Sequence, residues 1–129
     1  MRLLLDTHVL LWALAEPRRL SPRAASLIRD SSNTVLVSAA SAWEIATKHR
    51  LGRLPAAGAI IAAYSAHLLR LRAEELAIVS AHALRAGSFT VEHRDPFDRM
   101  FAAQAVLEGV PLVTDDAAFR LFSEVETIW

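Results

Sequence analysis

The chain has 129 residues, with 14 basic and 14 acidic side chains and no cysteine, so its formal net charge is zero. This length suits one domain with a single hydrophobic core, and we expect residues 1–129 to form it. The absence of cysteine excludes disulfides and thiolate metal sites, and the zero net charge supplies no overall basic field of the kind that attracts nucleic acid.

Hydrophobic residues make up 53% of the chain, and the mean hydropathy is +0.29, which is apolar for a soluble domain. Two explanations stay open: the sheet is buried on both faces, or apolar surface is kept for a partner. No apolar run approaches the roughly 20 residues of a membrane-spanning helix, and Asp6 interrupts the first run too early for a signal peptide. We therefore expect a cytoplasmic protein with no membrane segment.

The first half of the chain predicts two strands, each a short apolar run, and three helices. In chain order these elements are residues 2–5, 7–15, 22–30, 34–37 and 39–51. Ser21 and Pro22 begin the second helix as its N-cap and first residue, and Ser38 caps the third helix, which Gly52 ends. The predicted order in the first half is therefore strand, helix, helix, strand, helix.

The second half predicts three more strands and four helical segments. In chain order these are a helix at 56–69, a strand at 69–73, and helices at 74–87 and 97–108, followed by a strand at 111–114, a short helix at 115–122 and a strand at 125–129. Gly87 and Gly109 end the two longer late helices. Strands that alternate with helices and that lack a period of two indicate a parallel sheet covered on both faces.

Acidic residues gather at the carboxyl edge of this predicted sheet, where such sheets bind their ligands. Asp6 directly follows the first strand, and Asp115 and Asp116 follow the fourth strand. Asp98 opens the helix that leads into the fourth strand, and Glu44 lies about one and a half turns into the third helix. Clustered carboxylates repel one another unless a cation neutralises them, and ligand sets made only of oxygen favour Mg²⁺ or Mn²⁺.

The segment HRDPFDR, residues 93–99, contains two acids with different predicted roles. Asp95 precedes a proline and suits the N-cap of the helix. Asp98 shares a helix face with apolar residues, whereas Arg99 and Gln104 point elsewhere. The apolar residues on its face are Phe101, Ala102, Ala105 and Val106. A carboxylate on such a face needs a partner.

The other acids also have purely structural interpretations. Asp6 would cap the helix that follows it, and Glu44 would pair with Lys48 on a solvated helix face. One of Asp115 and Asp116 would cap the short helix after them. These interpretations are reasonable one by one, but together they leave several nearby carboxylates without compensation.

The histidines and tryptophans show no recognisable ligand spacing, so we expect structural or exposed roles for the histidines and core or interface roles for the tryptophans. The histidines are His8, His49, His67, His82 and His93, and the tryptophans are Trp12, Trp43 and Trp129. Glycine-rich phosphate loops and serine elbows are also absent. Phosphoryl chemistry at a metal held by carboxylates remains as the favoured interpretation.

Several segments resemble the PIN-domain ribonucleases, specifically the VapC-type toxins of bacterial toxin–antitoxin pairs. The matching segments are LLLDTHVLLWALAEPRRLS, VSAASAWEIATKHRLGRL, HRDPFDRMFAAQAVLEGVPLVTDDAAF and the terminal IW. They occur in the family's order and cover most of the chain except residues 55–90. The resemblance implies a three-layer α/β/α fold around a parallel sheet of about five strands.

The resemblance also implies a set of site residues. The implied catalytic and metal-binding residues are Asp6, Glu44, Asp98 and Asp116, where the family's Thr-x-Asp pattern selects Asp116 over Asp115. The implied supporting residues are Thr114, Asp115 and Asp95. Arg99 and Arg94 are candidates for contact with substrate phosphate, and a solvated salt-bridging role is the alternative for both.

The function implied by the resemblance is hydrolysis of RNA by a toxin that depends on Mg²⁺ or Mn²⁺. Its implied partners are RNA, a VapB-like antitoxin that occludes the site, and a second copy of the chain in a homodimer or hetero-oligomer. One alternative is a catalytically inactive PIN-like module that binds RNA or a partner. Another is a phosphoryl-aspartate protein, which is disfavoured because His8, not an acid, lies two residues after Asp6, and because no acid ends the second strand.

Overall fold

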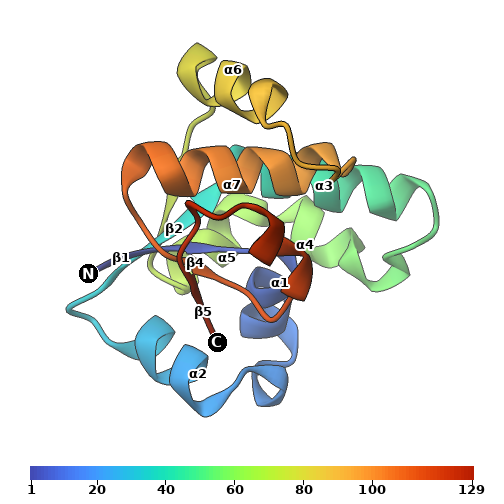
Figure 1. Cartoon of the computed structure of the whole chain (residues 1–129). Helices are drawn as coiled ribbons and strands as arrows, with labels where there is room; N and C mark the ends of the chain where they lie inside the picture. The colour runs from blue at the N-terminus through green and yellow to red at the C-terminus, as the bar shows by residue number, and fades with distance from the viewer.

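A five-stranded, all-parallel sheet forms the centre of the protein in a computed structural model that describes residues 1–129 (Figure 1). The strand order is β3-β2-β1-β4-β5. The strands are β1 (Arg2–Leu5), β2 (Thr34–Ser38), β3 (Ala73–Leu76), β4 (Leu112–Val113) and β5 (Thr127–Ile128). The predicted parallel sheet of about five strands is therefore confirmed.

Seven α-helices and three short 3-10 helices connect and cover the strands. The α-helices are α1 (Thr7–Ala15), α2 (Pro22–Arg29), α3 (Ala39–Arg50), α4 (Gly58–Ala62), α5 (Tyr64–Arg70), α6 (Ser80–Ser88) and α7 (Pro96–Glu108). The 3-10 helices are η1 (Pro17–Arg19), η2 (Pro55–Ala57) and η3 (Ala117–Leu121). None of the helices combines the length and the apolar character that crossing a membrane requires.

Helices cover both faces of the sheet, which gives the predicted three layers. Successive side chains of a strand point to opposite faces, so the fully buried Leu3 and Leu5 enter one core and Leu4 enters the other. Residues of α1, α2 and α5 share the first core, and residues of α7 and η3 share the second. Helix α6 packs on the outer side of α7, away from the sheet (Figure 1).

The strand register brings three chain segments to one edge of the sheet. Leu5 of β1 is paired with Val37 of β2 on one side and with Val113 of β4 on the other. The residues that follow these three strand positions are Asp6, Ser38 and Thr114. Because the three strands are parallel and in register, these residues emerge together at the carboxyl edge.

The middle of the chain differs from the prediction. The third strand is Ala73–Leu76 and not 69–73, so most of it falls in the segment predicted as the start of a helix, and α6 begins only at Ser80. Pairing with β2 overrides the helical composition of these residues, while a left-handed turn at Arg72 (φ 56°) separates them from α5. The predicted helix at 56–69 is divided into η2, α4 and α5, with Ala63 in a non-helical conformation between the last two.

Gln104 is also placed differently from the prediction. Its spacing from Asp98 predicts a face of α7 away from the core, but its side chain is fully buried. Because α6 and the segment before it cover the outer side of α7, both sides of this helix face protein. The Gln104 Nε2 donates to the carbonyl of Ala77 at 3.3 Å, and its Oε1 has no partner.

Gly109 ends α7 and turns the chain toward β4, as predicted. It adopts a left-handed conformation with φ 64° and ψ 40°, and Val110 N–H donates to the carbonyl of Ala105 at 3.0 Å. Residues with a Cβ rarely adopt this conformation because the Cβ approaches the following carbonyl. The sharp end of α7 therefore depends on glycine.

We expect Gly109→Ala to lower the free energy of unfolding by about 1 kcal/mol, because alanine is strained at positive φ. Gly87→Ala is the matched control: it lies within α6, and an added Cβ would meet no atom within 4 Å. That variant should be as stable as the native protein or more stable by up to about 1 kcal/mol. Urea unfolding of the three proteins checks this, and equal stability of Gly109→Ala and native protein would contradict it.

Candidate active site

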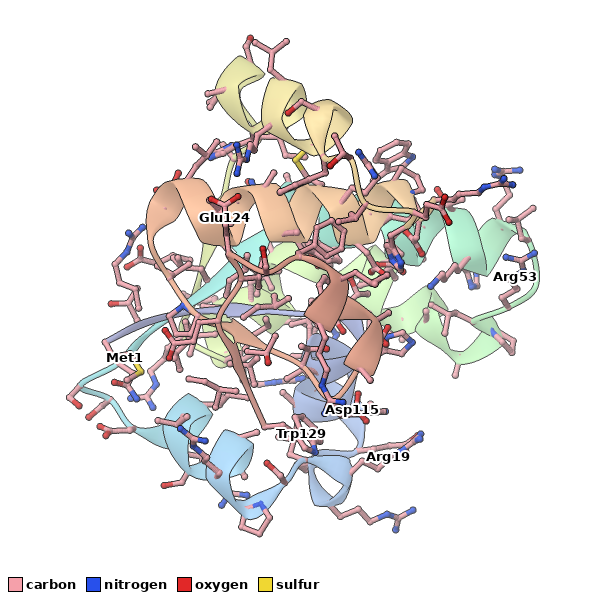
Figure 2. All side chains as sticks on the ribbon, viewed as in Figure 1. Met1, Arg19, Arg53, Asp115, Glu124 and Trp129 are labelled. Carbon is pink, nitrogen blue, oxygen red and sulfur yellow. The ribbon has the colours of Figure 1, made fainter.

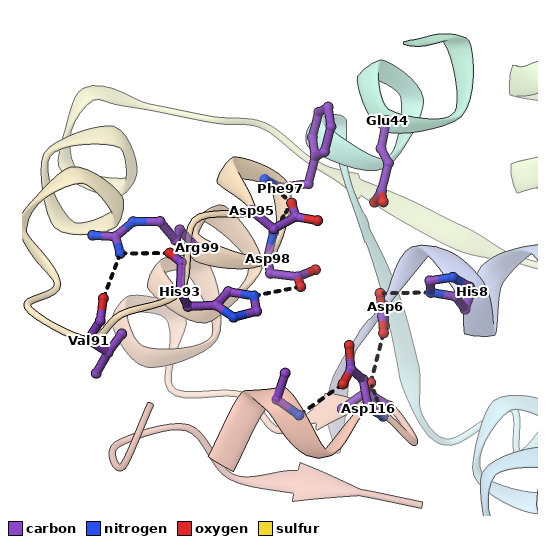
Figure 3. A network of polar contacts seen from close by, with 12 residues as sticks. Asp6, His8, Glu44, Val91, His93, Asp95, Phe97, Asp98, Arg99 and Asp116 are labelled. Carbon is purple, nitrogen blue, oxygen red and sulfur yellow. Dashed lines mark hydrogen bonds and ion pairs between the residues drawn. The ribbon is translucent and has the colours of Figure 1, made fainter. Parts of the chain in front are cut away.

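Four acidic side chains from four separate segments face one space at the carboxyl edge of the sheet (Figure 3). Asp6 follows β1, Glu44 lies on α3, Asp98 lies in the first turn of α7, and Asp116 precedes η3. These are the four residues singled out from the sequence. The parallel topology and the direction of α7 bring them together although they are up to 110 positions apart in the chain.

Asp6 does not cap the helix that follows it. It occupies the N-cap position of α1, but its side chain makes no capping hydrogen bond. The Oγ1 hydroxyl of Thr114 instead donates to Asp6 Oδ2 at 2.7 Å, and His8 Nδ1 lies 4.0 Å from Asp6 Oδ1. Only 2% of the surface of Asp6 is exposed. Asp6 is therefore a buried carboxylate, and the hydrogen bond that holds it comes from the residue after the neighbouring strand β4.

Glu44 combines the structural and the functional interpretation. The Nζ of Lys48 donates to Glu44 Oε2 at 2.5 Å, so the predicted pair one helical turn apart does form. The face is not solvated, however, because Glu44 is only 2% exposed. Its second oxygen, Oε1, is buried and has no hydrogen-bond partner. A buried, unpaired carboxylate oxygen is costly and marks a position where a further ligand would be favourable.

Of the two acids of HRDPFDR, Asp95 has the capping role that the sequence predicts. Asp95 caps α7, since its Oδ1 accepts hydrogen bonds from the backbone N–H groups of Phe97 at 2.9 Å and Asp98 at 3.2 Å. The Asp98 side chain takes no part in capping. Its Oδ2 lies 2.8 Å from His93 Nε2, and it is largely buried. Asp98 is therefore free of the structural role that its position in the first turn suggests.

Asp116 and Asp115 differ in their surroundings, although both are exposed. Asp116 Oδ1 accepts from the N–H of Ala118 and caps η3, and its own N–H donates to Thr114 Oγ1. Its carboxylate lies beside Asp6 (Figure 3). Asp115 lies at the molecular surface (Figure 2). The cap predicted for one of these acids belongs to Asp116 and uses one of its two oxygens.

Burial and neighbouring acids raise the pKa of two carboxyls in the site. Burial raises the pKa of the Asp6 carboxyl, the Thr114 hydrogen bond opposes this, and the charge of Glu44 adds to it. Burial also raises the pKa of Asp98 to about 6; the His93 hydrogen bond opposes the shift, and the charges of Asp95 and Asp6 increase it. Each of these two carboxyls therefore ionises less readily than an isolated carboxyl, because it is buried and because its neighbours are also acidic.

The pKa of Lys48 also responds to the negative charge of these carboxylates. Burial lowers its pKa, but the hydrogen bond and charge of Glu44, together with the charges of Asp95 and Asp98, raise it above the usual value for lysine. The net effect is upward, so the carboxylates outweigh desolvation at this position. A cation in this space is stabilised by the surrounding acids.

The donor set fits a hard divalent cation in composition and charge. As they stand, no three His, Asp or Glu side chains are grouped closely enough to hold a metal ion. Asp6, Glu44 and Asp98 are each bonded through one oxygen to a neighbouring donor. The unpaired Glu44 Oε1 and the raised pKa of Asp98 are the two features that a cation would relieve.

Two contacts of the structure are not predicted by the sequence. The spacing of His93 indicates no ligand role, yet its Nε2 lies 2.8 Å from Asp98 Oδ2, and its place just ahead of the Asp95 cap is the one local signal for this contact. The hydroxyls of Thr7 and Ser41 lie 3.0 Å apart and join α1 to α3. No sequence pattern indicated this long-range contact.

One predicted role changes in the structure. Arg99 is a sequence candidate for contact with substrate phosphate, but its guanidinium donates to backbone carbonyls at the end of α6 and in the segment between α6 and α7 and is not free for a ligand. Arg94 is exposed and lines an open cleft beside His93. Trp43, expected in a core or interface, is 59% exposed and packs its ring against Phe97 with centroids 4.7 Å apart.

Comparison with known proteins gives one family and one fold. Residues 3–125 match the family described as PIN domain. Ribonuclease VapC16 from Mycobacterium tuberculosis (strain ATCC 25618 / H37Rv) is 57% identical over 30 residues, which are 23% of this chain and 21% of that protein. The match thus spans about a fifth of the relative's length.

Two solved structures share the fold of the whole chain. VapBC2 from Rickettsia felis, bound to a DNA fragment from its promoter, has 15% identity and a TM-score of 0.67 over 99% of this chain and 98% of that chain. VapBC-1 from nontypeable Haemophilus influenzae has 17% identity and a TM-score of 0.68 over 99% and 97% of the two chains. At these identities the likeness concerns the fold alone.

We expect Asp98→Asn to raise the free energy of unfolding of the metal-free protein by about 2 kcal/mol at pH 7.5, because the variant removes a buried charge. The folded pKa of about 6 exceeds the ordinary value of 3.8, so ionised Asp98 destabilises the native protein above pH 6. As the pH falls from about 6 to 4, folded Asp98 becomes protonated and the advantage of the variant should disappear.

Urea unfolding in EDTA at pH 4.5, 6 and 7.5 measures this difference. Glu126→Gln is the control, since Glu126 is an exposed acid just before β5, at the opposite edge of the sheet. Its stability should follow that of the native protein at every pH. A lower stability of Asp98→Asn at pH 7.5 would contradict the assigned cost of the Asp98 charge.

Proposed function

The chain belongs to the PIN-domain family, and from this premise we propose that it is a metal-dependent endoribonuclease that hydrolyses RNA phosphodiester bonds. One observation carries the proposal: the carboxylates of Asp6, Glu44, Asp98 and Asp116 face one space at the carboxyl edge of a parallel sheet. Two of them are almost fully buried, which a purely structural role would not require. The printed name of one relative, a ribonuclease, agrees with this substrate.

The proposed cofactor is Mg²⁺ or Mn²⁺, held by Asp6, Glu44, Asp98 and Asp116. When bound, such a cation would activate water and would compensate the negative charge that develops on the phosphate. The oxygen-only donor set and the unpaired Oε1 of Glu44 support this choice of cation. One cation or two would both be compatible with four carboxylates.

The surrounding residues orient the acids. The hydroxyl of Thr114 holds Asp6, the ammonium of Lys48 holds Glu44, and His93 holds Asp98, each through one carboxylate oxygen. The other oxygen of each acid is left for the site. Exposed Arg94 is proposed to contact a substrate phosphate from the neighbouring cleft.

We propose that the protein is a cytoplasmic VapC-type toxin, that a VapB-like antitoxin covers its site, and that it assembles as a homodimer and as a hetero-oligomer with the antitoxin. Solved structures with the same fold are VapBC toxin–antitoxin complexes. Large apolar side chains are also exposed in the isolated chain, as expected for surfaces that partners cover. The most exposed of these are Met1, Trp43, Leu69, Val79 and Leu84.

The alternative is a catalytically inactive PIN-like module that binds RNA or a partner. One observation favours it: no three acidic side chains are grouped as a ready-made metal site, and Lys48 neutralises Glu44. The presence of all four acids favours the nuclease, because a binding module gains nothing from their mutual repulsion. An assay that separates RNA binding from cleavage distinguishes the two functions.

We expect the purified protein to cleave total cellular RNA in Mg²⁺ or Mn²⁺ and to lose this activity in EDTA. Asp6→Asn and Asp98→Asn should each lower the rate at least about 100-fold while remaining folded, and Glu126→Gln should cleave as the native protein does. Circular dichroism and thermal unfolding establish that the variants fold. Metal-dependent binding of RNA without any cleavage would support the inactive module, and equal cleavage by all variants would indicate a contaminating nuclease.

Asp116→Asn and Asp115→Asn test the fourth acid. Asparagine caps helices as well as aspartate does, so Asp116→Asn should keep the stability of the native protein while cleaving RNA at least about 10-fold more slowly. Asp115→Asn should change the rate by less than about 2-fold, because its exposed side chain makes no hydrogen bond or ion pair, whereas Asp116 lies beside Asp6 (Figure 3). Cleavage rates at saturating metal measure both, and the opposite ranking would transfer the role to Asp115.

A further inference from the structure

Arg99 makes an unusually complete set of hydrogen bonds to one short segment. Its Nε donates to the carbonyl of Ala86 at 2.8 Å, and its two terminal nitrogens donate to further backbone carbonyls in the last turn of α6 and in the linker before α7. These acceptors are Gly87 at 3.4 Å, Phe89 at 2.6 Å, Val91 at 3.3 Å and His93 at 3.1 Å. The guanidinium offers five N–H groups, and its planar fork suits such a set.

These bonds give shape to a segment that has little other structure. The carbonyls of Ala86 and Gly87 lie in the last turn of α6, where carbonyls lack helical partners and a cation is favourable. The other three belong to the linker before α7. Arg99 thus ties the end of one helix and the linker to the first turn of the next helix.

The segment ends at His93, which makes three contacts, one through its backbone and two through its ring. Its carbonyl accepts from Arg99, its ring packs edge to face on the buried Phe122 with centroids 5.6 Å apart, and its Nε2 lies 2.8 Å from Asp98 Oδ2. An ionised carboxylate can only accept, so the Nε2 of His93 carries the hydrogen in this bond. The ring therefore fixes one oxygen of Asp98 and sets the direction of the other.

We propose that Arg99 and His93 are positioning residues for Asp98: Arg99 shapes the linker, the linker places His93, and His93 orients the carboxylate toward the shared space. The inference rests on the proposed metal-dependent function. It extends that function to two residues outside the acid set, neither of which contacts the substrate or the cation. Outer groups that orient a metal-binding carboxylate commonly change metal affinity by about 10- to 100-fold.

The first test is Mn²⁺ binding to the purified protein without RNA, measured by calorimetry. His93→Leu keeps an apolar side chain against Phe122 but removes the donor, and should weaken Mn²⁺ binding by about 10-fold or more. His93→Gln retains an N–H donor at a similar distance from the backbone and should recover most of the affinity. His67→Leu, which removes a histidine bonded to Arg70 on α5, should bind as the native protein does.

The second test is a double-mutant cycle. Arg99→Lys keeps the charge but loses the five-donor fork, and should also weaken Mn²⁺ binding. If Arg99 acts through His93, the double variant Arg99→Lys/His93→Leu should lose no more affinity than the weaker-binding single variant. If the fold-losses of Mn²⁺ affinity of the two single variants multiply in the double variant, the two residues act independently. That result would overturn the proposal that Arg99 acts through His93. Thermal unfolding of each variant identifies any that fail to fold, and the His93 variants test the proposal without Arg99→Lys.

The outcomes separate this inference from the proposed function. If native protein binds Mn²⁺ and Asp98→Asn does not, the metal site stands. Native-like binding by His93→Leu, or failure of His93→Gln to recover affinity, would then overturn the positioning role alone. Absence of Mn²⁺ binding by the native protein would overturn both. In RNA cleavage at saturating Mn²⁺, His93→Leu should lower kcat with little change in KM, since no contact with RNA is removed.

Discussion

The hydroxyl of Thr114 is the group on which the arrangement of the site depends. It donates to Asp6 at the end of β1 and accepts from the backbone N–H of Asp116, so one oxygen positions two of the four acids. This is possible because β1 and β4 are adjacent, parallel and in register, which places the residues after Leu5 and Val113 side by side. A buried carboxylate requires such a donor, and the neighbouring strand supplies it.

The same carboxylates place acidic groups next to an otherwise apolar interior. Leu3, Leu4 and Leu5 of the central strand are fully buried, whereas the next residue is an acid with a raised pKa. Burial and mutual repulsion both oppose ionisation there, and Lys48 offsets only part of the charge. Places where a sequence breaks the rules of core composition are commonly functional, because selection for stability alone would remove them.

Helix α7 connects the core to the site. Its inner side packs on the sheet, its outer side is covered by α6, and its first turn carries Asp95 as the cap, Asp98 in the site and Arg99 bonded to the linker. The first turn of one rigid helix thus serves three purposes. The position of Asp98 relative to β1 is consequently determined by core packing, and its orientation by the linker that Arg99 holds.

The sequence by itself determined the alternation of strands and helices, the parallel sheet, the caps at Ser38 and Asp95, the glycine end of α7 and the segments that carry the acids. These follow from local rules of periodicity, capping and chain direction. It did not determine β3, because pairing with β2 overrides the helical composition of Ala73–Leu76.

Only the tertiary structure decided the burial of Gln104, the unpaired oxygen of Glu44, the bond between His93 and Asp98, and the engagement of Arg99. Each depends on which segments cover a helix or approach a side chain. A pattern along the chain records which residues share a face, but the partner on the other side of that face is set by the packing of distant segments.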